Sequence, residues 1–228
     1  MTMFQERAVL IAALWLVAVA VRFQRSRIVL LGGLVALGLY AFVALLAGQL
    51  SLSELGMSLP IAWIPTLGWA VAWPALMLAW SPVADRLATR LVDEPPTLGA
   101  FRALQESTAK LLAGIVVAWV LGGFLEELVF RGIILRAVEA ALVGHVGQAS
   151  ASAIAILTAA LGAGIIHLYQ GARAAIIIVQ LSILFGVLFV ASGHNLGAVM
   201  LCHGLYDTIA FIRFANKSSR YAQFAENE

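Results

Sequence analysis

The sequence predicts an all-α, polytopic transmembrane helix bundle of about seven membrane helices. Hydrophobic residues occupy 62% of the 228 positions and charged residues only 11%, whereas soluble domains are about half apolar and about a quarter charged. The mean hydropathy is +0.97. Apolar runs of about 20 residues, enough for a helix to cross about 30 Å of hydrocarbon, recur along the chain. We therefore interpret residues 1–228 as a single membrane domain.

Seven apolar runs define the expected helices. The first lacks a basic stretch before it and a small-residue cleavage site after it, so it is interpreted as a retained helix, not a signal peptide. Pro65 and Pro74 predict kinks in the third. The fourth is too long for a simple span, so we expect it to protrude or break. The expected ranges are about 8–22, 28–50, 61–80, 108–142, 149–169, 172–192 and 195–214.

The polar residues between these runs predict the topology. Residues 81–107 are expected to form a cytoplasmic polar loop with a short amphipathic helix, because Pro95 and Pro96 break a charged stretch. Lysine and arginine concentrate in cytoplasmic loops. Here they follow the first, third, fifth and seventh helices, which places the N-terminus outside and the C-terminus in the cytoplasm. These basic residues are Arg22, Arg25, Arg27, Arg86, Arg90, Arg102, Lys110, Arg173, Lys217 and Arg220.

Small size and compact loops favour a multi-pass protein of a bacterial cytoplasmic membrane. The net charge is +2, but the cations are scattered between apolar runs. They therefore indicate topology rather than nucleic-acid binding. The lipid bilayer is the expected surrounding, and nucleic acid is not an expected partner.

Among the ionisable residues inside the expected spans, we single out six. Each charge costs at least about 2.5 kcal/mol near the centre of a bilayer, so such residues are expected to face a bundle interior or a cavity. Three are on the fourth helix, one is near the end of the fifth and two are on the seventh, so three helices could converge on one polar pocket. The six are Glu126, Glu127, Arg131, His167, His203 and Asp207.

Helical spacing separates these residues into groups. Glu127 and Arg131 are four residues apart and suit an ion pair, whereas Glu126 is turned about 100° away and is free to face elsewhere. His203 and Asp207 are again four apart. Structural roles are the simpler alternatives: an ion pair on the fourth helix, an interfacial His167 and a hydrogen bond on the seventh. Their joint presence in charge-poor helices favours a functional pocket.

The residue types favour hydrolysis by an activated water. No G-x-S-x-G is present, and Cys202 diverges from its neighbour His203 on a helix, so it is interpreted as a small packing residue. H-E-x-x-H is also absent. Two carboxylates and two histidines instead suit a carboxylate that takes a proton from water while an imidazole or a metal stabilises the oxyanion. No cofactor is expected, although Glu126, His167 and His203 could hold a divalent metal such as zinc.

Three ordered motifs resemble the CPBP family of intramembrane proteases, also called Abi, which includes the CAAX prenyl proteases. They are Glu126-Glu127-x-x-x-Arg131, the histidine of "AGIIHLYQG" and His203-x-x-x-Asp207 in "CHGLYD". The resemblance covers about residues 108–210, the expected catalytic core.

The resemblance implies a role for each motif residue. Glu126 would activate water with the help of His167, and His203 and Asp207 would bind the oxyanion. Glu127 and Arg131 would orient the site. Two departures from the family pattern stand out: Ala163 replaces the usual aromatic residue four positions before the histidine, and Asp207 stands where asparagine is frequent. A protonated Asp207 could donate to an oxyanion; alternatively, it orients His203 or helps to hold a metal.

The leading hypothesis is therefore an intramembrane endopeptidase that acts on a membrane-associated or lipid-modified protein or peptide, such as a CAAX-like tail, a peptide precursor or a sorting signal. One alternative is a non-proteolytic membrane scaffold or bacteriocin-immunity protein with the same fold. Another is a proton-coupled transporter, since buried Glu, His and Asp also form proton relays. The two halves of the sequence show no convincing symmetry, which ranks the transporter last.

Overall fold

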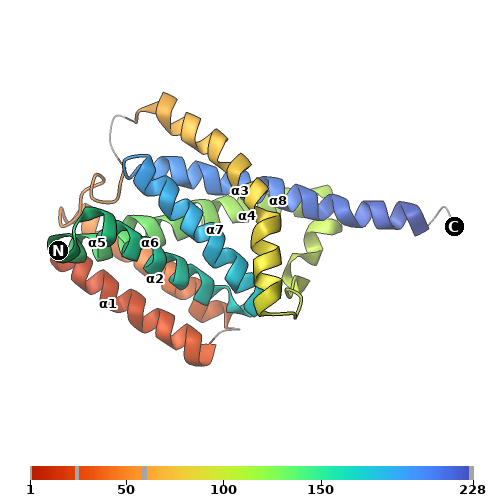
Figure 1. Ribbon diagram of the computed structural model, residues 1–228, viewed down its shortest axis with the longest axis horizontal. Coiled ribbons are helices and arrows are strands. Elements are labelled where there is room, and N and C mark those ends of the chain that lie inside the picture. Colours follow the sequence, from red (N-terminus) through yellow and green to blue (C-terminus); the bar gives the residue numbers. More distant parts are fainter. Residues whose placement is uncertain (1, 24–25, 58–60, 226–228) are drawn as a thin grey trace.

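The computed structural model describes all residues except 1, 24–25, 58–60 and 226–228, and the described residues form helices and connections without a strand. Seven helical segments among them are long and apolar enough to cross a membrane. This confirms the predicted all-α transmembrane bundle. The first described turn begins after Thr2, which caps it together with Gln5 in a reciprocal capping box,. From this capped turn the first membrane helix runs toward the opposite end of the bundle (Figure 1).

The helices have the following bounds. The first hairpin consists of α1 (Met3–Ala18), its π-helical end η1 (Val19–Phe23) and α2 (Arg27–Leu46). After it come α3 (Trp63–Leu91) and the 3₁₀ helix η2 (Gly99–Gln105). One continuous helix then comprises α4 (Thr108–Ala118), π-helical η3 (Trp119–Glu126) and η4 (Leu128–Leu135), and α5 (Arg136–Val146). The remaining elements are α6 (Gln148–Ile166), 3₁₀ η5 (Leu168–Gln170), α7 (Ala172–Ala191) and α8 (Leu196–Ala225).

One expectation about a helix end is wrong. The predicted loop 81–107 is helical up to Leu91, because Ala84 and Ala88 pack into the protein and extend the buried face of α3 past the apolar run. Only residues 92–98 of this stretch precede η2 without helical structure. Pro65 lies in the first turn of α3, where its missing N–H interrupts no helical hydrogen bond, so the chain has no reason to kink there.

The long fourth helix does not break. It runs without interruption from Thr108 to Val146, and its middle is π-helical. Short π-helical stretches inside α-helices frequently mark functional sites. Here one of them ends at Glu126 and the next begins at Leu128, so the two meet at the glutamate pair.

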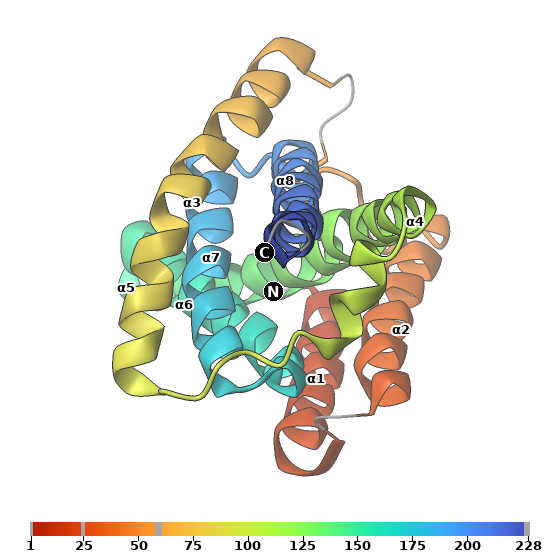
Figure 2. The same cartoon turned by 90° about the vertical axis from the view of Figure 1, so that its right-hand side faces the viewer.

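The helix α8 runs through the middle of the bundle, between α7 on one side and α4 on the other (Figure 2). It also contacts α3 and η3, while α6 packs along α7 and α5. The first hairpin, α1 and α2, contacts η4 from another side, and the Trp15 indole N–H ties it by donating to the Val29 carbonyl at 2.8 Å. The central position of α8 brings its side chains close to both the long helix and α7.

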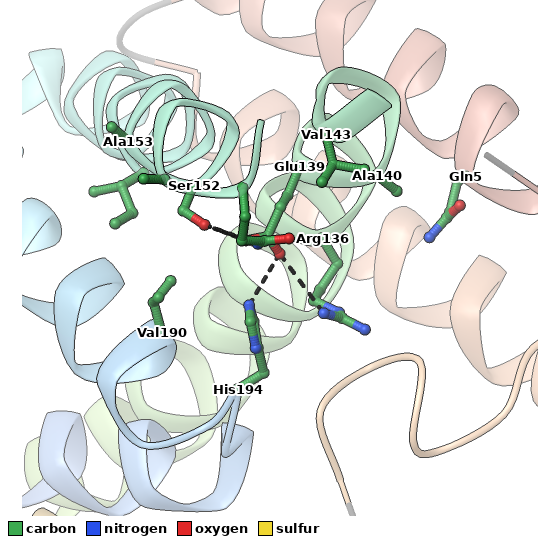
Figure 3. A pocket seen from close by; sticks show the side chains of 12 residues that line it. Gln5, Arg136, Glu139, Ala140, Val143, Ser152, Ala153, Val190 and His194 are labelled. Atoms are coloured by element: carbon green, nitrogen blue, oxygen red, sulfur yellow. Dashed lines mark hydrogen bonds and ion pairs between the residues drawn. The ribbon is translucent and has the colours of Figure 1, made fainter. Parts of the chain in front are cut away.

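A polar cluster joins the helices at the end of the bundle where α1 begins (Figure 3). The carboxylate of Glu139, 4% exposed, accepts hydrogen bonds from Ser152 and from Gln148 at 2.7 Å. It also lies 2.9 Å from His194 Nε2 and 3.6 Å from the Arg136 guanidinium. Because side chains from three parts of the chain contact one carboxylate, the cluster holds α5, α6 and the α7–α8 turn together. His194 therefore serves this cluster, although the sequence placed it only in a loop.

Candidate active site

The predicted convergence of three helices is present. A cavity of about 680 Å³ lies between the long helix, the end of α6, α7 and α8. It extends to Pro96 and to Gln170 at the end of η5, and η2 contributes Phe101 and Leu104 to its lining. Two hydrogen bonds hold this region: Thr97 N donates to Gln170 O at 2.7 Å, and Gln105 Nε2 of η2 donates to Phe214 O at 3.1 Å. Five of the six predicted site residues line this cavity, namely Glu126, Arg131, His167, His203 and Asp207.

The side chains of Glu126 and His167 approach each other at the wall of the cavity. Their carboxylate Oε1 and imidazole Nε2 are 3.9 Å apart, and the two side chains are 15% and 16% exposed. His167 Nδ1 lies 2.8 Å from the carbonyl oxygen of Ala163, one turn earlier. Because a carbonyl can only accept, this contact places a proton on Nδ1. A neutral His167 therefore turns the lone pair of Nε2 toward Glu126.

The same contact explains how the site accommodates Ala163. The backbone carbonyl orients His167, so the hydrogen bond does not depend on the side chain at position 163. Ala163 itself lines the cavity. The missing aromatic ring thus leaves room in the cavity without releasing the histidine.

Glu127 and Arg131 form the ion pair expected from their spacing. Arg131 Nη1 donates to Glu127 Oε1 at 3.1 Å, and Nε lies 3.1 Å from Oε2, with the two side chains 2% and 0% exposed. The guanidinium also reaches α7, where Nη2 donates to the carbonyl oxygen of Ser182 at 2.8 Å and to its hydroxyl at 2.6 Å. A buried charge needs a partner and further hydrogen bonds. Ser182 supplies two of these, while Arg131 Nε and Glu127 Oε2 are in ion-pair contact without a hydrogen bond.

His203 connects this ion pair to the cavity. Its Nδ1 lies 2.6 Å from Glu127 Oε1, so the carboxylate that pairs with Arg131 also accepts from the imidazole. Its Nε2 faces Asp207 Oδ2 at 3.5 Å. The Phe185 ring stacks on the imidazole, with centroids 4.5 Å apart and planes inclined by 25°. Glu127 therefore determines which imidazole nitrogen points into the cavity.

Sequence reasoning missed Ser182 and Phe185. Both belong to α7, an apolar helix between the second and third motifs, and neither is part of a motif. The available signal was indirect: a buried arginine has five N–H donors, which one carboxylate cannot satisfy. Cys202, in contrast, is fully buried in the hydrophobic core and lines no part of the cavity, which agrees with its interpretation as a packing residue.

The arrangement of the His, Cys, Asp and Glu side chains bears on the metal considered from the sequence. Within the part of the chain that the structure describes, no group of three or more His, Cys, Asp or Glu side chains is arranged to hold a metal ion. Binding of a divalent metal by Glu126, His167 and His203 stays a prediction from the sequence. We derive no catalytic step through a metal.

The chain was compared with known proteins. A family model described as type II CAAX prenyl endopeptidase Rce1-like matches residues 108–209. The matched segment runs from the start of α4 into α8 and contains all six ionisable site residues. The match confirms the resemblance indicated by the motifs. No curated protein and no solved structure matches the chain.

Proposed function

We propose, from the family match and the convergence of Glu126, His167, His203 and Asp207 on one cavity, that the protein hydrolyses a peptide bond in a membrane-associated or lipid-modified protein. The observation that carries the proposal is the pairing of a partly hydrated carboxylate with an imidazole whose lone pair faces it, across the cavity from a second imidazole. This is the arrangement that activation of water requires.

In the proposed reaction, Glu126 is the general base. A water held between its carboxylate and His167 Nε2 can reach both groups, because 3.9 Å leaves no direct hydrogen bond between them,. Glu126 takes one proton from this water as the oxygen attacks the scissile carbonyl carbon. The same proton then passes to the leaving amine when the C–N bond breaks, so the glutamate returns to its ionised form.

His203 and Asp207 are proposed to stabilise the oxyanion. The Nδ1 of His203 is engaged by Glu127 at 2.6 Å, which directs Nε2 to the cavity. An imidazole that carries a proton on both nitrogens donates Nδ1–H to Glu127 and presents Nε2–H to the oxyanion. Asp207, 3.5 Å from Nε2, either donates as a protonated acid or orients the imidazole.

The lining of the cavity supports a membrane-associated substrate. Apart from the motif residues, apolar side chains from η2, the long helix, α7 and α8 line the cavity. An extended peptide with a hydrophobic side chain or a lipid group fits such walls better than a charged peptide does. A CAAX-like tail, a peptide precursor and a sorting signal are the substrate classes we propose. The apolar lining includes Leu98, Phe101, Val117, Leu121, Ile177, Ile178, Leu181, Phe211 and Phe214.

The multi-pass membrane location follows from the seven apolar helices. We further propose a bacterial cytoplasmic membrane with the N-terminus outside and the C-terminus in the cytoplasm. The basic residues Arg86, Arg90 and Arg173 belong to the ends of α3 and α7 that lie at the same end of the bundle as η2. By the positive-inside rule this end faces the cytoplasm, which would give cytoplasmic tails access to the cavity.

Cleavage by the purified protein tests the proposal. Wild type, Glu126→Gln and the control Glu106→Gln would be incubated with membrane-anchored and lipid-modified peptides, with and without a chelator, and products identified by mass spectrometry. Glu106 is an exposed glutamate that pairs with Lys110 outside the cavity. Cleavage by wild type and by Glu106→Gln, lost in Glu126→Gln and unaffected by chelator, is expected.

Retained cleavage by Glu126→Gln would refute the assignment of the base, and loss with chelator would refute the metal-free step. A biological phenotype that survives Glu126→Gln would instead favour the scaffold or immunity alternative.

A further inference from the structure

We propose that Phe185, on α7, is a positioning residue for this reaction, whose ring holds the His203 imidazole at the angle that directs Nε2 into the cavity. The inference rests on the proposed function, because it concerns the orientation of a residue in that site. No sequence motif contains Phe185, and it acts through His203 rather than on the substrate.

The ring of Phe185 contacts two side chains of the site, those of His203 and Arg131. Its centroid is 4.5 Å from that of His203 and 5.4 Å from Arg131 Cζ, while its own side chain is 4% exposed. A third contact, edge-on to Tyr206 at 6.4 Å and 90°, holds the ring from the side. Phe185 is therefore a fixed flat surface rather than a mobile wall of the cavity.

His203 needs such a surface because its hydrogen bonds do not determine its tilt. Only the Nδ1 contact with Glu127, 2.6 Å, is within hydrogen-bond distance, whereas Nε2 is 3.5 Å from Asp207,. One hydrogen bond at Nδ1 leaves the imidazole able to swing about its Cβ–Cγ bond within the angular tolerance of that hydrogen bond. A stacked aromatic face opposes this rotation, and it also attracts a neighbouring cation through its quadrupole. An aliphatic side chain of similar size provides neither effect.

The position of α7 does not depend on Phe185 alone. One turn earlier, Ser182 receives two hydrogen bonds from Arg131, at 2.8 Å through its carbonyl and 2.6 Å through its hydroxyl. This contact holds α7 against the long helix. A substitution of Phe185 should therefore remove the flat ring while the helix that carries it stays in place.

The chain offers a matched control on the same helix. Phe189, one turn after Phe185, is 0% exposed and also touches a histidine, but its partner is His194 at the opposite end of the bundle, with centroids 5.1 Å apart. Phe189→Leu thus removes the same atoms from the same apolar core without touching the site. Any general loosening of the bundle should appear in both variants.

The test compares kcat and KM of wild type, Phe185→Leu, Phe185→Tyr and Phe189→Leu on one cleavable peptide, with protein that elutes as a folded species from detergent size-exclusion chromatography. We expect Phe185→Leu to lower kcat by about tenfold and to leave KM within roughly twofold, because the lost orientation acts in the transition state. Phe185→Tyr keeps an aromatic face and should restore most of kcat. Phe189→Leu should match wild type.

Equal losses of kcat in Phe185→Leu and Phe189→Leu would overturn the inference, as would a change confined to KM or no change at all. If Phe185→Tyr does not fold, the comparison of the two leucine variants still decides. Absence of cleavage by the wild type on every peptide offered would instead refute the proposed function, so the two failures are distinguishable.

Discussion

Glu127→Gln is the substitution with the largest expected effect on the stability of the site. Glu127 is fully buried and serves two partners: its Oε1 accepts from Arg131 Nη1 at 3.1 Å and from His203 Nδ1 at 2.6 Å. Its Oε2 lies 3.1 Å from Arg131 Nε. Glutamine keeps the shape and one acceptor, but it removes the negative charge. Its amide group would also bring a donor against the N–H of Arg131.

The expected cost follows from leaving a buried guanidinium without its counter-ion. Removing one partner of a buried ion pair destabilises proteins by about 3–5 kcal/mol. The ratio of folded to unfolded protein should therefore fall by a factor of roughly a hundred to a few thousand. Ser182 still accepts from Arg131 Nη2, which favours the lower half of that range.

Replacing both partners separates lost charge balance from lost packing. Well-packed apolar substitutes for a buried ion pair are often neutral, so Glu127→Leu/Arg131→Met should be more stable than Glu127→Gln. It should still be inactive, because His203 Nδ1 then has no acceptor.

Reversible unfolding in mixed detergent micelles, followed by tryptophan fluorescence, measures both variants. A cost below about 1 kcal/mol for Glu127→Gln would refute this account of the pair. So would a double variant whose loss of unfolding free energy equals the sum of the losses in Glu127→Leu and Arg131→Met.

Two further predictions concern the end of the bundle opposite the active site. Glu139→Ala leaves four donors without their common carboxylate, so we expect a loss of about 1–3 kcal/mol in the same unfolding assay. The protein that remains folded should cleave at the wild-type rate, and a selective loss of kcat would contradict a purely structural role. Gly56 has φ +84°, its carbonyl accepts from Leu196 N at 2.8 Å, and an added Cβ would meet the backbone of His194. Gly56→Ala should therefore cost at least about 1–2 kcal/mol, and an unchanged unfolding midpoint would show that this connection is not packed as described.

The sequence alone was sufficient for the membrane fold and for the motif residues of the site. Hydropathy and run length are local properties, and a helix must satisfy its backbone within itself in lipid, so seven apolar runs predict seven helices. Spacing within one helix is equally local. This is why the Glu127–Arg131 pair was predictable, as was the divergence of Glu126 from that pair.

Helix ends were less predictable than helices. Hydropathy falls at position 81, yet α3 continues to Leu91, because alanines at 84 and 88 keep one buried face against the bundle. Whether a helix continues past its apolar run with only one buried face depends on the neighbouring helices, whose positions a single sequence does not give. The long fourth segment, expected to protrude or break, does not break, and it contains π-helical turns around the two glutamates.

Only the tertiary structure decided which side chains meet across helices. Nearly every face of these helices is apolar, so the sequence pattern does not specify how each helix is rotated about its own axis. The meeting of Glu127 with His203, of Arg131 with Ser182 and of Phe185 with the imidazole depends on that rotation. The sequence by itself therefore determined a membrane bundle and its candidate chemical groups. Packing determined that one buried carboxylate orients the imidazole while its neighbour is left free to contact water.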